Sequence, residues 1–182
     1  MQRKKPPQDH TSGAVAPEAV QLAVIGHVRS PYTERFGTPR QPTVQQQTLL
    51  DRAVEASIEL LPGCNYEQAL QDLEGFEYIW VMTYLHLNRH WKPTVVPPRG
   101  PKVRRGLFAT RSPHRPNPLG LSALKLLGVQ GRVIRVLGID LLDSTPVLDI
   151  KPYVPYADAF PGARAGWLDA LGEAPDAPDR WE

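Results

Sequence analysis

The sequence predicts a mainly β protein, arranged as a closed or sandwiched antiparallel sheet with one minor helix and long proline-rich loops. Short segments of strand-like composition recur between turn signals along the chain. Proline contributes 20 and glycine 14 of the 182 residues, which argues against a helical bundle. The fingerprints G-x-G-x-x-G and G-x-x-x-x-G-K-[ST] are absent from the sequence, so neither a Rossmann domain nor a P-loop NTPase is expected.

The strands are expected, in chain order, at residues 22–28, 54–60, 78–87, 103–110, 119–129, 132–142 and 147–150. In the segment 54–60, apolar and polar residues alternate until Pro62 and Gly63, which is typical of a half-buried strand. Residues 78–87 are nearly all β-branched, aromatic or aliphatic, which favours a buried central strand. Gln130 and Gly131 are expected to form the turn between the strands on either side of them.

A short helix is expected over residues 66–73, capped by Asn65 and followed by Gly75. One domain is expected between residues 21 and 167. Residues 1–20 lack periodicity, which indicates a disordered arm, and residues 168–182 form an acidic tail. The loop 31–42 contains three prolines and one glycine, and its aromatic and basic residues favour a functional role.

Several classes of protein are not expected from the composition. The only cysteine, Cys64, excludes a disulfide framework and a multi-cysteine metal site. The histidine pair His86 and His90 spans the end of the strand at 78–87 and the loop after it, so no metal site is expected there. No apolar run reaches the ~20 residues of a membrane helix, and no signal core follows the basic start, so a cytoplasmic location is expected.

The formal net charge of +2 conceals a strong asymmetry along the chain. No Asp or Glu lies between Glu77 and Asp140, and this stretch holds 11 Lys and Arg residues. Such a segment suits the binding of a polyanion or phosphate, although a solvated basic face is an equally good reading. The candidate phosphate-binding residues are Arg29, Arg99, Lys102, Arg104 and Arg105.

The densest motif is Arg111-Ser-Pro-His-Arg-Pro-Asn-Pro-Leu-Gly-Leu-Ser122. Its three prolines stiffen the backbone and would hold the polar side chains between them in fixed directions, as a binding site requires. The alternative is a rigid turn before a strand. After the acid-free stretch, Asp140 and Asp143 could accept hydrogen bonds from ribose hydroxyls, an adenine amino group or an α-ammonium group, or could pair with nearby arginines.

These segments resemble, in the same order, the TsaA-like or TrmO family, whose characterised members are S-adenosylmethionine-dependent tRNA methyltransferases. The matching segments are 25–32, 36–42, 73–80, 104–110, 111–122, 140–143 and 145–153. The resemblance implies a β-barrel methyltransferase fold unlike the Rossmann enzymes, usually in a homodimer. It also implies methylation of N6 of threonylcarbamoyladenosine beside the anticodon of threonine tRNA.

The resemblance implies an S-adenosylmethionine site of eleven residues. They are Gln41, Pro42, Thr43, His86, Leu87, Arg111, Leu121, Asp140, Leu141, Leu142 and Asp143. Leu87 stands where some relatives have a polar residue, so its contact would be apolar or through the backbone. Longer bacterial members carry an extension after the segment that ends at Tyr153, whereas this sequence ends soon after Trp167.

In this reaction the cofactor already carries an activated methyl group, so the protein would mainly align the reactants. Asp143, His114 and Asn117 are the candidates to accept the proton from N6. Arg115, with Arg99, Lys102, Arg104 and Arg105, would hold tRNA phosphates. Two other functions remain open: an RNA-binding barrel without catalysis, and methylation of a different acceptor.

Overall fold

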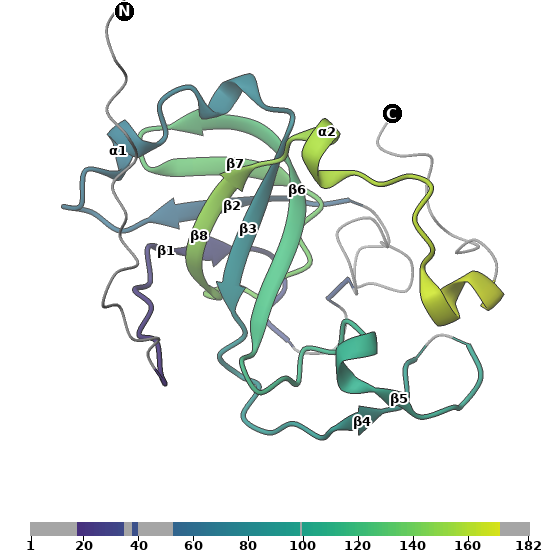
Figure 1. Ribbon diagram of the computed structural model, residues 1–182. Coiled ribbons are helices and arrows are strands. Elements are labelled where there is room, and N and C mark those ends of the chain that lie inside the picture. The colour runs from purple at the N-terminus through teal and green to yellow at the C-terminus, as the bar shows by residue number, and fades with distance from the viewer. Residues whose placement is uncertain (1–17, 35–37, 40–52, 99, 172–182) are drawn as a thin grey trace, which may run out of the picture.

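A computed structural model describes residues 18–34, 38–39, 53–98 and 100–171, and its centre is a closed antiparallel barrel (Figure 1). The barrel strands follow one another around the wall in the order β1-β2-β7-β6-β3-β8. The mainly β prediction is therefore confirmed, and the sheet is closed rather than sandwiched. None of the described helices is both long and apolar enough to cross a membrane.

The barrel strands are β1 Gly26–Arg29, β2 Glu55–Leu60, β3 Tyr78–Tyr84, β6 Leu119–Gln130, β7 Val133–Leu137 and β8 Pro146–Pro152. Outside it, β4 Thr94–Val95 and β5 Arg105–Gly106 form a two-stranded sheet. The helices are short: α1 Tyr66–Ala69 and α2 Pro155–Asp158, with 3₁₀ turns η1 Leu73–Gly75, η2 Leu107–Ala109 and η3 Gly166–Leu171.

The core is the inside of the barrel, because alternate residues of each strand point inward. The side chains with no exposed surface there include Ile58 of β2, Ile79 and Val81 of β3, Leu124 of β6 and Ile134 of β7. The register Val81↔Ser122 and Met82↔Leu121 joins β3 to β6, and the pair Gly26↔Val147 closes the barrel between β1 and β8. This alternation is the pattern that predicted the strand at 54–60.

Four predicted strands have clearly different limits in the structure. The last, expected at 147–150, is longer and runs from Pro146 to Pro152. The first strand begins at Gly26 rather than at residue 22, and β7 ends at Leu137, after which Gly138 takes a φ of 85°. Strand β3 ends at Tyr84 rather than at residue 87. Its last pair with β6 is Tyr84↔Leu119, and one further backbone hydrogen bond joins Leu85 to Pro118 before the two segments separate.

The strand prediction for 103–110 is wrong over most of its length, and the helix prediction for 66–73 is confirmed only over its first half. Residues 103–110 contribute only the two-residue β5 and then the turn η2. The helix ends at Ala69, and Asp72, with a φ of 66°, separates it from η1, which includes Gly75. Asn65 does not cap the helix through its side chain. Its amide Nδ2 donates to Oε1 of Gln68 at 2.7 Å instead.

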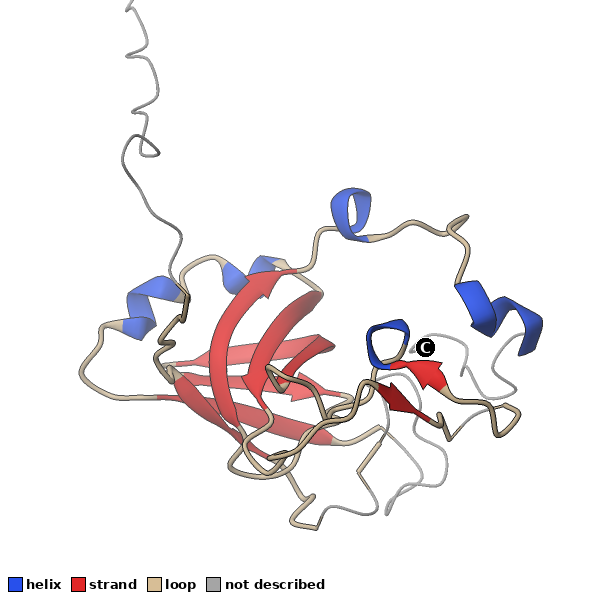
Figure 2. Cartoon of the chain, turned by 60° about the horizontal axis from the view of Figure 1, so that its bottom comes forward, coloured by secondary structure: helices blue, strands red, loops and turns tan. Residues whose placement is uncertain are grey.

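The topology places several connections at one end of the barrel, here called the site end. The ends of β1, β3 and β7 and the beginnings of β2, β6 and β8 meet there, because neighbouring strands are antiparallel. Residues 85–118 leave the barrel at this end and return to it, forming an excursion that contains β4, β5 and η2 (Figure 2). The loop 138–145 and residues 30–34 lie at the same end.

The expected domain boundaries remain predictions. Residues 1–17 and 172–182 lie outside the described residues. Within the described residues, η3 runs from Gly166 to Leu171 across the boundary expected at residue 167. Figure 1 shows η3, in yellow, on the side of the molecule where η2 and β5 lie.

Candidate functional site

Two of the motif segments meet at the site end through hydrogen bonds. The backbone N–H of Ser30 donates to Oδ1 of Asp143 at 3.1 Å, and the Ser30 hydroxyl donates to the carbonyl oxygen of Leu141 at 2.8 Å. The N–H of Asp143 donates in return to the carbonyl oxygen of Tyr32 at 2.7 Å. The end of β1 and the loop 138–145 are therefore fixed to each other.

The carboxylate of Asp143 takes part in this attachment with both of its oxygens. Its Oδ2 accepts a hydrogen bond from the hydroxyl of Ser144 at 3.0 Å. Desolvation opposes ionisation of Asp143. The hydrogen bonds from Ser30 and Ser144, together with the charge of Arg29, outweigh it and lower the pKa of Asp143 below its usual value. Asp143 is thus a stable anion that holds the loop.

Asp140 has the opposite electrostatic environment. Desolvation of its carboxyl group raises its pKa from 3.8 to about 6, although the hydrogen bond from Ser122 and the charge of Arg111 act in the other direction. The Ser122 hydroxyl donates to Oδ1 of Asp140 at 2.6 Å. Ser122 lies on β6 and Arg111 begins the proline-rich motif, so three segments converge on this carboxyl group.

Polar side chains also line the inside of the wall near this end. Ser122 and Thr83 point inward from the neighbouring strands β6 and β3, and both are buried. The Thr83 hydroxyl has no hydrogen-bond partner among the described residues. Gly120, which pairs with Thr83, leaves room for this hydroxyl, because a Cβ on Gly120 would collide with it.

The proline-rich motif is braced from within by Arg115. Its guanidinium donates to the carbonyl oxygens of Thr110 at 2.9 Å and of Leu107 and Ser112 at 3.4 Å each. It also lies 5.4 Å from the ring centroid of Phe108, a cation–π contact. All three hydrogen bonds come from Nη1, so one end of the guanidinium holds the backbone of the excursion.

The remaining residues expected at the cofactor site lie in different surroundings. Leu141 is buried in the core, so its side chain faces away from a ligand, and Leu142 is partly buried against the core. Leu121 points outward from β6 and is 57% exposed, on the opposite side of the strand from Ser122. His86 and exposed Leu87 follow β3, where the N–H of Leu85 donates to the carbonyl oxygen of Pro118 at 2.7 Å.

The two other catalytic candidates lie on the proline-rich motif. His114 is partly buried and Asn117 is exposed. The carbonyl oxygen of Asn117 accepts a hydrogen bond from the N–H of Leu119 at 2.8 Å, which fixes the entry into β6. Gln41, Pro42 and Thr43 lie outside the described residues.

The expected phosphate-binding residues lie on the excursion, except Arg29 at the end of β1, and they differ in their contacts. Lys102 and Arg104 are exposed. The guanidinium of Arg105 lies 5.1 Å from the ring centroid of Trp167 in η3. Arg29 is held by Glu59, whose Oε2 accepts from its Nε at 2.8 Å. Arg99 lies outside the described residues.

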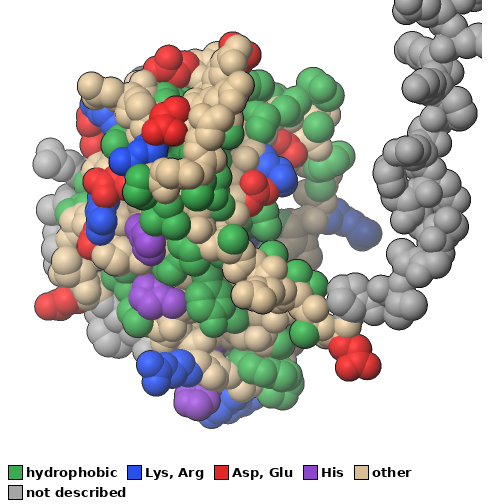
Figure 3. Space-filling view, turned by 90° about the vertical axis from the view of Figure 1, so that its left-hand side faces the viewer, with side chains coloured by type: hydrophobic (Ala, Val, Ile, Leu, Met, Phe, Trp, Pro, Cys, Tyr) green, Lys and Arg blue, Asp and Glu red, His purple; other side chains and the backbone are tan. Residues whose placement is uncertain are grey.

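Figure 3 shows the face on the left of Figure 1. Lys, Arg and His side chains lie along its lower edge, whereas its upper half carries acidic and basic side chains together. The excursion 85–118 lies at the bottom of Figure 1, so the basic edge belongs to the site end. Among the described residues, no three His, Cys, Asp or Glu side chains group as metal ligands.

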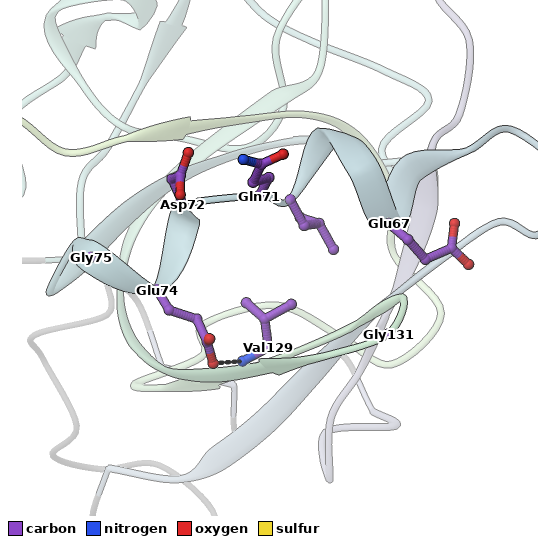
Figure 4. A pocket seen from close by; sticks show the side chains of 8 residues that line it. Glu67, Gln71, Asp72, Glu74, Gly75, Val129 and Gly131 are labelled. Atoms are coloured by element: carbon purple, nitrogen blue, oxygen red, sulfur yellow. Dashed lines mark hydrogen bonds between the residues drawn. The ribbon is translucent and has the colours of Figure 1, made fainter.

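A pocket at the opposite end of the barrel does not fit an anionic substrate. Glu67, Asp72 and Glu74 line it, beside Val129 and Gly131 of the hairpin between β6 and β7 (Figure 4). A Glu74 carboxylate oxygen accepts from the N–H of Val129 at 2.9 Å. None of the residues expected at the functional site lines this pocket.

Sequence reasoning missed two serines that hold the site together. Ser122 could have been found, because it is a polar residue at an inward position of a strand whose other inward positions include Leu124. Ser30 could have been found from its place between a strand and Pro31, where serine side chains commonly bond to nearby backbone.

The fold and the site define an antiparallel barrel protein with a cluster of polar side chains at one end, bordered by a basic excursion. The family described as the tRNA-methyltransferase O N-terminal domain matches residues 27–159, and the chain belongs to that family. The resemblance found in the sequence is therefore confirmed.

Individual relatives agree with this assignment. The chain is 42% identical over 161 residues to the tRNA (adenine(37)-N6)-methyltransferase of Escherichia coli, covering 85% of this chain and 66% of the relative. It is 39% identical over 137 residues to the human protein of the same name, covering 74% of this chain and 30% of that protein. The chain thus spans less than two thirds of the length of these relatives.

A solved structure, the crystal structure of TrmO from Pseudomonas aeruginosa, has the same fold. The TM-score is 0.67 at 38% sequence identity, and the match covers 86% of this chain and 64% of the other. The likeness includes the barrel and extends over most of the described residues.

Proposed function

We propose that this chain is an S-adenosylmethionine-dependent methyltransferase that modifies N6 of adenosine 37 in tRNA. The observation that carries the proposal is the convergence of Arg111, Ser122 and Asp140 at the site end, directly beside the basic excursion. The relatives named for this reaction are 42% and 39% identical to the chain and support it. Within this reaction, we propose threonylcarbamoyladenosine of threonine tRNA as the substrate and the cytoplasm as the location.

The residues present fit S-adenosylmethionine. This cofactor has a carboxylate, an α-ammonium group, ribose hydroxyls and an adenine amino group. Arg111 supplies a cation, Asp140 supplies an acceptor, and the buried Thr83 hydroxyl supplies a polar group with no partner among the described residues. When bound, the cofactor supplies a methyl group on a sulfonium, which needs no further activation before transfer.

Each residue has a distinct part in this proposal. Arg111 would hold the carboxylate of the cofactor, and Asp140 would accept from its hydroxyls or its ammonium group. The backbone of Leu141 and the partly buried Leu142 would complete the loop, because the side chain of Leu141 is buried in the core. Gln41, Pro42 and Thr43, together with His86 and Leu87, are proposed to complete the cofactor site.

Of the three candidates to accept the proton from N6, we propose His114. The pKa of Asp143 is lowered and both of its oxygens already accept hydrogen bonds, so its carboxylate is a weak base. Asn117 has an amide, which cannot take up a proton near neutral pH, whereas an imidazole can. Asp143 therefore acts by holding the loop that carries Asp140.

We also propose that the chain forms a homodimer through the outer wall of β3 and β6. Tyr84, Leu119 and Leu121 are 43%, 40% and 57% exposed, and they are neighbours because Tyr84 pairs with Leu119 and Met82 with Leu121. A contiguous apolar patch of this kind is typical of an interface. Light scattering should show a dimer for the wild type and a monomer for Leu119→Asp.

The function is tested by incubating the purified chain with S-adenosylmethionine and tRNA from cells that lack it. Mass spectrometry of the nucleosides should show one added methyl group on threonylcarbamoyladenosine. Methylation of tRNA without the threonylcarbamoyl group would instead show a different acceptor. Salt-sensitive RNA binding without thermal stabilisation by S-adenosylmethionine would identify a non-catalytic RNA-binding barrel.

A further inference from the structure

Phe108 is an aromatic side chain held in a fixed but exposed position. It is 78% exposed, whereas its neighbour Leu107 in η2 is 2% exposed and anchors the turn. The carbonyl oxygen of Leu107 accepts a hydrogen bond from the Thr110 hydroxyl at 2.8 Å. Exposure of this ring is therefore not the result of a loose loop.

Two side chains hold η2 in place, one distant in the sequence and one from the following loop. The indole N–H of Trp167 in η3 donates to the carbonyl oxygen of Ala109 at 2.8 Å. The guanidinium of Arg115 bonds the carbonyl oxygens around η2 and lies over the Phe108 ring at 5.4 Å. An exposed phenyl ring gains nothing from the core, so this bracing indicates a role in binding.

The exposed charged residues that flank Phe108 in the sequence are cationic. Arg104, Arg111 and Lys102 are exposed on the same excursion, and no Asp or Glu occurs in the sequence between Glu77 and Asp140. Asp169 is brought near by η3, but its carboxylate accepts from the N–H of Ala165 at 2.9 and 3.1 Å. The partner of Phe108 should therefore be an anion that also offers a flat apolar face.

We propose that Phe108 stacks on an unpaired base of an RNA loop, while the neighbouring cations contact the phosphates of that loop. Unpaired bases splayed from RNA loops stack on aromatic side chains, and each such contact contributes ~1–3 kcal/mol. Phe108 is three residues from Arg111, whose charge acts on Asp140, so the stacked base lies next to the proposed cofactor pocket. The identity of the loop as the anticodon loop rests on the proposed function.

The test compares full-length Phe108→Ala and Phe108→Trp with the control Phe160→Ala. Phe160 is a matched control, because it is 74% exposed and follows α2 rather than lying on the excursion. The probes are an anticodon stem-loop of threonine tRNA with 2-aminopurine in its loop, and an RNA duplex of the same stem without the loop.

Phe108→Ala should weaken binding of the stem-loop about 5- to 150-fold, in line with the loss of ~1–3 kcal/mol of stacking. It should also reduce the quenching of 2-aminopurine. Phe108→Trp should retain both, Phe160→Ala should match the wild type, and duplex affinity should not change. Equal affinity of the wild type and Phe108→Ala for the stem-loop would overturn the proposal and reassign Phe108 to a protein contact.

An equal loss for the loop and the duplex would overturn it as well, because Phe108 would then act through the fold of the excursion. Calorimetry with S-adenosylmethionine separates this inference from the proposed function. A chain that binds no S-adenosylmethionine but loses loop affinity on Phe108→Ala keeps the stacking contact and contradicts the methyltransferase. If the chain methylates tRNA but Phe108→Ala leaves the affinity for the loop unchanged, the methyltransferase is kept and the stacking contact is contradicted.

Discussion

The Ser122 hydroxyl donates a hydrogen bond of 2.6 Å to Oδ1 of Asp140 and thereby joins the wall of the barrel to the loop after β7. The two residues are 18 positions apart in the sequence. The contact holds a carboxyl group in a desolvated position, where ionisation is unfavourable. The desolvated position of Asp140 therefore lowers the stability of the folded protein. The fold nevertheless retains this residue at the proposed cofactor pocket.

Asp140→Asn should stabilise the protein in a pH-dependent manner. The folded-state pKa of Asp140 is raised from 3.8 to about 6, so the folded state binds the proton more tightly than the unfolded state. Wild-type stability therefore falls as pH rises through this window, by about 3 kcal/mol in total. Urea denaturation should show that the advantage of Asp140→Asn grows between about pH 4 and pH 6 and is constant above it.

The control for this series is Glu55→Gln. Glu55 is exposed and pairs with Arg135 at 3.0 Å on the surface of the barrel, where such pairs contribute ~0–1 kcal/mol. A stability difference between Asp140→Asn and wild type that is the same at every pH would contradict the assignment of the raised pKa to Asp140.

Arg111→Ala should weaken S-adenosylmethionine binding about 10- to 100-fold, because a hydrogen bond to a charged group contributes ~1.5–3 kcal/mol. Arg111→Lys should recover part of the loss, since it keeps the charge without the planar fork. Isothermal titration calorimetry measures the affinity, with Arg135→Ala on the outer surface as the control. Unchanged affinity in Arg111→Ala would remove this residue from the cofactor site.

Arg115→Lys should lower thermal stability even though it conserves the charge. Lysine cannot reproduce the bonds to the carbonyl oxygens of Leu107, Thr110 and Ser112, and the loss should be ~1–3 kcal/mol. Differential scanning calorimetry tests this. If Arg115 instead contacts tRNA phosphates, the lysine variant should keep both its stability and most of its tRNA affinity.

Gly120→Ala should destabilise the barrel by ~1–3 kcal/mol, because the new Cβ would collide with the Thr83 hydroxyl inside the wall. Gly106→Ala is the matched control, since nothing lies within 4 Å of a Cβ at that position. Chemical denaturation of the two variants should differ accordingly. Equal stability of the two variants would contradict the prediction, because it would show that Thr83 can shift to accommodate the new Cβ.

Much of the barrel could be predicted from the sequence, because burial on one face of a strand leaves a period of two. The alternation at 54–60 and the apolar run from Tyr78 identified β2 and β3. The end of β3 could not be predicted in this way. Leu85 and Leu87 continue the apolar composition, and only the register with Leu119 determines where pairing stops.

The site could be predicted in its residue types but not in all of its contacts. Asp140, Asp143 and Arg111 were found from their motifs. The motif could not reveal that Arg115 bonds to the backbone, because a free arginine and a bracing arginine have the same sequence signature. The opposite pKa shifts of Asp140 and Asp143 depend on desolvation and on bonds from Ser122 and Ser30, which only the fold brings together.

The bond between Trp167 and Ala109 also determines when the site can be completed during synthesis. The two residues are 58 positions apart, and the barrel strands lie before Trp167 in the chain. A chain folds progressively from its N-terminus as it emerges from the ribosome. The barrel can therefore close while the excursion that carries Arg111 still lacks the hydrogen bond from Trp167. Translation to the end of η3 is thus needed before the nascent chain can hold η2 as the finished protein does.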